Sequence, residues 1–63
     1  MTEDEFRALL AVEGEQLFII GPLSDNRYVA TTTKTSIGID DYAYGKTYTD
    51  AVQNLIRVHY ANH

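Results

Sequence analysis

The segment from Thr47 to Ala61 constrains the fold more than any other part of the chain, because its apolar residues recur at the spacing of an amphipathic α-helix. With successive residues about 100° apart around the axis, one stripe gathers on a single face. That stripe consists of Tyr48, Ala51, Val52, Leu55, His59 and Asn62. Thr47 can cap the helix, and Asp50 follows it at the spacing of a capping box. Such a helix must bury its stripe against another element.

A second helix is predicted at the N-terminus, over residues 3–13. Thr2 and Glu5 form a capping-box pattern, and the acidic first turn complements the positive end of the helix dipole. Gly14 follows as a natural stop, because glycine adopts the left-handed conformation without a Cβ penalty. One face of this helix carries Phe6, Leu9, Leu10 and Glu13. Capping explains the acidic start, and a role in binding is the alternative.

Three strands are predicted between the helices, over residues 16–20, 27–34 and 37–44. The first contains an unbroken apolar run, Leu17–Ile20, which favours a central strand or one that is buried on both faces. The second is rich in Tyr, Val and Thr, but neither of its faces is strongly apolar, so we expect it to be partly exposed. The third is weakened by Gly38.

Strict alternation along the third strand assigns its side chains to two faces. One face takes Ile37, Ile39, Asp41 and Ala43, and the other takes Asp40, Tyr42 and Tyr44. On this assignment the neighbouring carboxylates of Asp40 and Asp41 point in opposite directions. They are therefore not expected to act together on one substrate atom.

The predicted fold is α+β, with the order α-β-β-β-α and both helices packed on one face of a three-stranded antiparallel sheet. The 63 residues allow one domain, 1–63, which would bury only roughly 60% of the surface of its unfolded chain. Hydrophobic residues make up 44% of the chain, which is ordinary for a globular protein. Cysteine is absent, so disulfides and thiolate metal sites are excluded.

The formal net charge of −4 arises entirely from the first 15 residues, which hold five acidic residues against Arg7. In the rest of the chain, four acidic residues balance four basic ones. This distribution argues against nucleic-acid binding, which requires clustered Lys and Arg, and is compatible with a basic partner. No apolar run approaches the roughly 20 residues of a membrane span, and the acidic start is the opposite of a secretory signal. A cytoplasmic protein is the expectation.

The sequence contains no catalytic constellation, metal-ligand cluster or phosphate-binding loop. His59 and His63 have the spacing of a metal pair on a helix, but no cysteine or third histidine completes a closed site. We therefore expect a partly buried His59 that hydrogen-bonds to the sheet. Ser24 and Asp25 are explained by turn chemistry. The prediction is of no enzyme, no catalytic residue, no metal ligand and no cofactor.

Tyrosine is the leading aromatic residue, with five tyrosines against two phenylalanines and no tryptophan. Tyrosine provides a large contact area with a polar tip and is enriched at interfaces. Ordinary half-buried packing is the alternative, because tyrosine also suits strands. The candidate partner-binding residues are Tyr28, Tyr42, Tyr44 and Tyr60, with Glu3 and Asp4 of the acidic helix.

Two families share features with this chain. The α-β-β-β-α order resembles the double-stranded RNA-binding domain, whose RNA contacts use basic residues at the start of the last helix; here that stretch holds only Lys46. The segment Gly45–Ala51, with the upstream strand Tyr28–Ala30, resembles the Gly-x-Thr-x-x-Glu/Asp-Ala motif of HicB-like antitoxin domains over about residues 27–60. The first resemblance implies nucleic-acid binding, and the second implies binding to a small toxin.

The function predicted from sequence is that of a small acidic, non-enzymatic protein-binding module. Such a chain would suit a phage or mobile-element accessory protein that inhibits or adapts a host factor. A HicB-like toxin-neutralising domain and a nucleic-acid-binding domain of the double-stranded RNA-binding topology are the alternatives. A homodimer is compatible with all three, because an exposed strand edge invites pairing.

Overall fold

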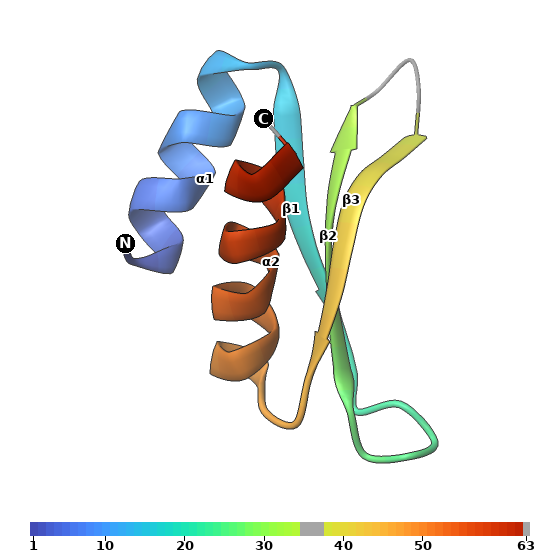
Figure 1. The fold of residues 1–63 in the computed structure, drawn as a ribbon. Helices are drawn as coiled ribbons and strands as arrows, with labels where there is room; N and C mark the ends of the chain where they lie inside the picture. The colour runs from blue at the N-terminus through green and yellow to red at the C-terminus, as the bar shows by residue number, and fades with distance from the viewer. Residues whose placement is uncertain (35–37, 63) are drawn as a thin grey trace.

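A computed structural model describes residues 1–34 and 38–62, and it has the predicted order of helix, three strands and helix (Figure 1). The elements are α1 (Glu3–Val12), β1 (Glu15–Ile20), β2 (Tyr28–Lys34), β3 (Gly38–Gly45) and α2 (Tyr48–Asn62). The strands form an open antiparallel sheet in the order β1-β2-β3, and both helices lie on the same face of it (Figure 1). The predicted α+β fold is therefore confirmed. In the described part of the chain, neither helix has the length and apolar character needed to cross a membrane.

The predicted position of the first strand in the sheet is wrong, whereas the expected partial exposure of the second strand is found at its two ends. β1 is an edge strand, and β2 is the central strand. The apolar run in β1 does not indicate burial on both faces, because its side chains alternate between two surfaces. Leu17 is buried under the helices, whereas Phe18 and Ile20 are exposed on the other face. In β2 the threonines Thr31 and Thr32 are almost fully buried, since small β-branched side chains fit a central strand flanked on both sides.

A β-bulge between β2 and β3 overturns the predicted alternation of the third strand. Thr32 pairs with Asp41, but the next residue, Thr33, pairs with Ile39, so Asp40 is the extra residue of the bulge. For the residues of β3 that precede the bulge, the face of the sheet to which each side chain points is the opposite of the predicted one. Ile39 therefore lies on the uncovered face, where it is 62% exposed, instead of sharing the face of Asp41.

The same bulge changes the position of Asp40. Its carboxyl group interacts with that of Glu15, which lies on the helix-covered face of β1. Asp40 and Asp41 are thus both directed toward the helix layer, and the predicted opposite orientation is wrong. Ile37, which was assigned to the same strand, lies outside the described residues.

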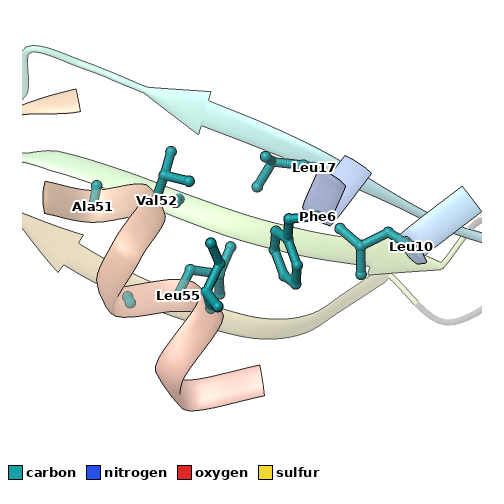
Figure 2. Close-up of a cluster of buried hydrophobic side chains, with 9 residues drawn as sticks. Phe6, Leu10, Leu17, Ala51, Val52 and Leu55 are labelled. Atoms are coloured by element: carbon teal, nitrogen blue, oxygen red, sulfur yellow. The ribbon is translucent and has the colours of Figure 1, made fainter. Parts of the chain in front are cut away.

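The core lies between the helices and the sheet, and α1 and α2 contribute most of its bulk (Figure 2). It consists of Phe6, Leu10, Leu17, Ala30, Ala43, Ala51, Val52, Leu55 and Ile56. Leu9, which was predicted on the buried face of α1, is 45% exposed. α1 packs mainly against the edge strand β1, so only the narrow stripe of Phe6 and Leu10 is covered.

The predicted helix caps are present. The Thr2 hydroxyl oxygen accepts a hydrogen bond from the Glu5 amide at 3.2 Å, and the Glu5 carboxylate accepts from the Thr2 amide at the same distance. These bonds hold the pKa of Glu5 below its usual value. At α2, the Thr47 hydroxyl oxygen accepts from the Asp50 amide at 3.0 Å. Gly14 ends α1 with a φ of 77°, in the left-handed region that glycine favours.

Gly45, the last residue of β3, allows α2 to start directly against the sheet. A Cβ atom at this position would lie 2.2 Å from the backbone nitrogen of Ala51. No side chain fits in that gap, and the obstacle is helix backbone that cannot rotate away. The glycine therefore sets the distance between β3 and the first turn of α2.

Substitution of Gly45 by alanine should consequently destabilise the fold by about 1–3 kcal/mol, the usual range for overpacking a core. Lys46→Ala is the matched control, because Lys46 is the exposed neighbour in the same turn. Urea denaturation monitored by circular dichroism measures both free energies of unfolding. Equal stability of the two variants would show that α2 does not dock at the distance described.

Candidate functional site

The face of the sheet opposite the helices is uncovered in the described structure, and three cross-strand rows form it. The rows, which together make the open face, are Gln16–Thr33–Ile39, Phe18–Thr31–Tyr42 and Ile20–Val29–Tyr44. None of these nine side chains is charged. On a chain with a net charge of −4, all nine positions of this face are therefore uncharged, and the Arg27 guanidinium lies over the Tyr44 ring at one end of it.

The open face is also strongly apolar. Five of its side chains retain between 43% and 62% of their accessible surface. They are Phe18, Ile20, Ile39, Tyr42 and Tyr44. The rings of Tyr42 and Tyr44 meet edge to face, with centroids 6.0 Å apart. Contiguous exposed apolar surface of this kind is typical of sites of interaction with other proteins.

A cleft adjoins one end of the open face. It is lined by Arg27, Tyr44, Gly45, Lys46, Asp50 and Asn54. The Arg27 guanidinium lies 4.6 Å above the Tyr44 ring and also donates to the Asp25 carboxylate at 2.5 Å, which holds the pKa of Asp25 below its usual value. Because Asp25 and Asp50 offset the two basic residues, the cleft does not provide the clustered positive charge that nucleic-acid binding requires.

The structure divides the tyrosines predicted to bind a partner between two layers. Tyr42 and Tyr44 lie on the open face. Tyr28 lies on the helix-covered side, where its ring meets that of Tyr48 edge to face at 6.5 Å. Tyr60 is exposed on α2, and its hydroxyl donates to Met1 Sδ at 3.7 Å. The five tyrosines therefore do not form one surface.

The acidic candidates lie on α1, away from the open face. The Glu3 carboxylate accepts hydrogen bonds from Arg7 Nε at 2.9 Å and from the Tyr48 hydroxyl at 3.0 Å, so it ties α1 to α2. Asp4 is exposed. Sequence reasoning missed Phe18, Ile20 and Ile39 as surface residues. The unbroken apolar run of β1 was the available signal, since a strand with one covered face has every second apolar side chain exposed.

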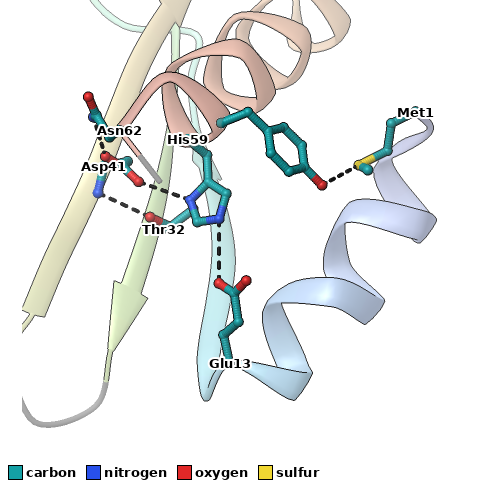
Figure 3. A network of polar contacts seen from close by, with 7 residues as sticks. Met1, Glu13, Thr32, Asp41, His59 and Asn62 are labelled. Atoms are coloured by element: carbon teal, nitrogen blue, oxygen red, sulfur yellow. Dashed lines mark hydrogen bonds and ion pairs between the residues drawn. The ribbon is translucent and has the colours of Figure 1, made fainter.

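A buried polar cluster lies on the other side of the sheet, between β3, α2 and the α1–β1 junction (Figure 3). His59 Nδ1 lies 3.0 Å from Asp41 Oδ2, and His59 Nε2 lies 3.4 Å from Glu13 Oε2. His59 and Asp41 are 4% and 5% exposed. The predicted hydrogen bond from a buried His59 to the sheet is confirmed. His63, the other half of the predicted pair, lies outside the described residues.

Both the side chain and the backbone of Asp41 form hydrogen bonds with neighbouring elements. Asn62 Nδ2 donates to Asp41 Oδ1 at 2.8 Å, and the Asp41 amide donates to Thr32 Oγ1 at 3.0 Å. Asn62 of α2 thus fixes the carboxylate that faces His59, and Thr32 of β2 fixes the backbone of the same residue. This arrangement orients the imidazole ring and directs its Nε2 atom toward Glu13 (Figure 3).

Glu15 completes the cluster and is 3% exposed. Burial raises the pKa of its carboxyl group, and the neighbouring carboxyl groups of Asp40 and Glu13 raise it further, whereas Lys34 lowers it. Among the described residues, Glu15 Oε1 has no hydrogen-bond partner. A buried carboxylate oxygen without a hydrogen bond disfavours the folded state, so Glu15 is a destabilising residue of the helix layer.

Comparisons with family models, with curated proteins and with solved structures give no match for this chain. The resemblances to HicB-like antitoxins and to double-stranded RNA-binding domains therefore stay predictions.

Replacing Glu15 with glutamine should stabilise the protein at neutral pH. Because the folded pKa of Glu15 lies above the ordinary value of 4.5, the folded chain retains a proton that the unfolded chain releases between these two values. Stability therefore falls as the pH rises through that window and stays lower above it. Glu15→Gln removes this loss and should gain about 1 kcal/mol at pH 7, with little gain at pH 4.

Urea denaturation at the two pH values measures the effect, with Glu5→Gln as the control of opposite sign. Hydrogen bonds from Thr2 lower the pKa of Glu5, so that variant should lose stability above the folded pKa instead of gaining it. An identical pH response of the wild type and Glu15→Gln would contradict the raised pKa.

Proposed function

We propose that this chain is a non-enzymatic protein-binding module and that the open face is its binding surface. The observation that carries the proposal is the set of five half-exposed apolar and aromatic side chains on nine contiguous, uncharged positions of one sheet face. Burying such a surface against a partner gains roughly 25 cal/mol for each Å² of apolar area. We further propose a cytoplasmic location, which the absence of cysteine supports.

The composition of the open face matches the centre of a protein interface. Such centres are depleted in charged residues and enriched in tyrosine and phenylalanine. The central row, Phe18–Thr31–Tyr42, places a small buried threonine between two protruding aromatic rings. Two exposed rings on either side of a smaller side chain suit a partner that inserts an aliphatic or aromatic side chain between them, as interface hot spots commonly do.

The partner that fits is a different protein with an apolar patch and a neutral or positive net charge. Two copies of this chain would each carry a net charge of −4, which opposes their association. The small size of the open face also argues against a homodimer. Stable interfaces take about 20–30 residues from each side, and three rows of three supply nine. A larger partner can extend onto the cleft beside Tyr44, whereas face-to-face stacking of two copies is limited to the open face.

The proposal predicts that a photo-crosslinking residue on the open face captures a partner that the helix layer does not contact. We would place p-benzoylphenylalanine at Tyr42 and, as a matched control, at Tyr60, which has a similar exposure, 51% against 59%, but lies on α2. Irradiation of the expressing cells should give a discrete crosslinked protein from position 42 alone. The purified partner should then bind the chain, and Phe18→Thr should weaken that affinity about tenfold or more.

Tyr60→Gln serves as the control in the binding measurement and should leave the affinity unchanged. Threonine at position 18 keeps the β-propensity of the strand, so folding is preserved and can be checked by circular dichroism. Crosslinks from both positions, from neither, or only to nucleic acid would overturn the proposal. Crosslinks only to a second copy of the chain would show that the open face is a homodimer interface instead of a binding surface for a different protein.

A further inference from the structure

We propose that Glu13, Glu15 and His59 bind one divalent transition-metal ion, for which Zn²⁺ is the best match. One imidazole nitrogen and one oxygen from each carboxylate all lie within 4.8 Å of one another. The residues come from the end of α1, the start of β1 and α2. The site lies in the helix layer and is independent of the binding surface proposed on the open face.

One donor separation in the cluster matches the edge of a tetrahedral site, and all the donor atoms lie within 4.8 Å of one another. Zinc binds imidazole nitrogen at about 2.0–2.1 Å and carboxylate oxygen at about 2.0–2.2 Å, so neighbouring ligand atoms of a tetrahedral site lie roughly 3.3–3.5 Å apart. His59 Nε2 and Glu13 Oε2 are separated by 3.4 Å. That distance is long for a strong charge-assisted hydrogen bond but equals one edge of the coordination tetrahedron.

The second nitrogen of His59 is already prepared for metal binding. Nδ1 lies 3.0 Å from the Asp41 carboxylate, which Asn62 holds in place (Figure 3). A histidine that ligates a metal commonly donates its other N–H to a carboxylate in this way, which fixes the tautomer and turns the Nε2 lone pair toward the ion. In that tautomer Nε2 has no proton, and its lone pair faces the Glu13 carboxylate. A cation between the two removes this repulsion.

Glu15 supplies the independent observation that points to a ligand. Its carboxylate is almost fully buried, and Oε1 has no hydrogen-bond partner among the described residues. Buried charges in proteins are normally paired or coordinate metals. A bound divalent ion would satisfy this oxygen and would offset the negative charge that Glu13, Glu15, Asp40 and Asp41 bring around His59.

The donor set determines the class of ion. Magnesium and calcium prefer sites built of oxygen alone, whereas imidazole favours zinc and its neighbours in the first transition row. Three protein ligands leave the fourth tetrahedral position for water or for a further donor. An ion held in this way joins the α1–β1 junction to α2. Its binding should therefore stabilise the fold, as binding to the native state alone always does.

Isothermal titration calorimetry of the chelator-treated protein with ZnCl₂ tests the proposal. We expect one ion per chain, and a rise in Tm of about 10 °C or more when Zn²⁺ is in hundredfold excess over its Kd. Glu13→Gln, Glu15→Gln and His59→Gln should each weaken binding at least tenfold. Asp41→Asn, which changes the group that orients His59 and leaves the three ligands in place, should weaken it by about ten- to hundredfold.

At least two of the variants should remain folded, so a loss of Zn²⁺ binding in them can be distinguished from unfolding. The Glu13 side chain is 51% exposed, so Glu13→Gln should fold normally. Glu15→Gln should be more stable than the wild type without metal, yet it should gain less from Zn²⁺. Asp4→Asn, which changes an exposed carboxylate at the far end of α1, is the matched control and should bind Zn²⁺ with unchanged affinity.

Three results would overturn the proposal. The first is the absence of measurable Zn²⁺ binding, which would leave His59 with a purely structural role between the Asp41 and Glu13 carboxylates. The second is Zn²⁺ binding that persists in Glu13→Gln and Glu15→Gln but disappears in His63→Gln, which would assign the ion to His59 and His63. The third is Mg²⁺ or Ca²⁺ binding at the same site with equal affinity, which would exclude a transition-metal site.

Discussion

The hydroxyl oxygen of Thr32 accepts a hydrogen bond from the backbone amide of Asp41 at 3.0 Å, at the point where β3 carries its extra residue. Both proposed sites depend on this bulge. Before it, Ile39 faces outward and extends the open face; after it, Asp41 faces inward and reaches His59. A regular pairing with the same residues would bury Ile39 among the carboxylates and would move Asp40 to the open face, which would then carry a charge.

The two faces of the sheet therefore have opposite chemistry. The open face has no charged side chain, whereas the helix layer contains a buried histidine with carboxylates on both sides. In so small a chain, buried ionisable groups are a considerable cost, because folding buries only roughly 60% of the available surface. Hydrophobic packing alone does not account for a core that contains Glu15, Asp41 and His59 beside Phe6 and Leu55.

The sequence was sufficient for the elements with local signals and insufficient for those that depend on pairing. Capping at Thr2 and Thr47 and the middle of the α2 stripe are set by neighbours within a few residues, and these predictions are confirmed. The two ends of the stripe, Tyr48 and Asn62, are exposed. The bulge is set by the register between β2 and β3, which alternation within one strand cannot reveal. The cluster around His59 was missed for the same reason, since Glu13 and Glu15 approach it only when α1 folds back on β1.

The motif that resembles HicB-like antitoxins is accounted for by the docking of α2. Gly45 is required because a Cβ would strike the Ala51 backbone, and Thr47 caps the amide of Asp50. Ala51 itself is fully buried at this contact. Any chain in which a helix starts directly against the end of a strand meets the same requirements, so the motif favours a local geometry and not a particular partner. What distinguishes this chain lies elsewhere, in the uncharged open face and in the carboxylates around His59, and those residues are the ones whose substitution discriminates between functions.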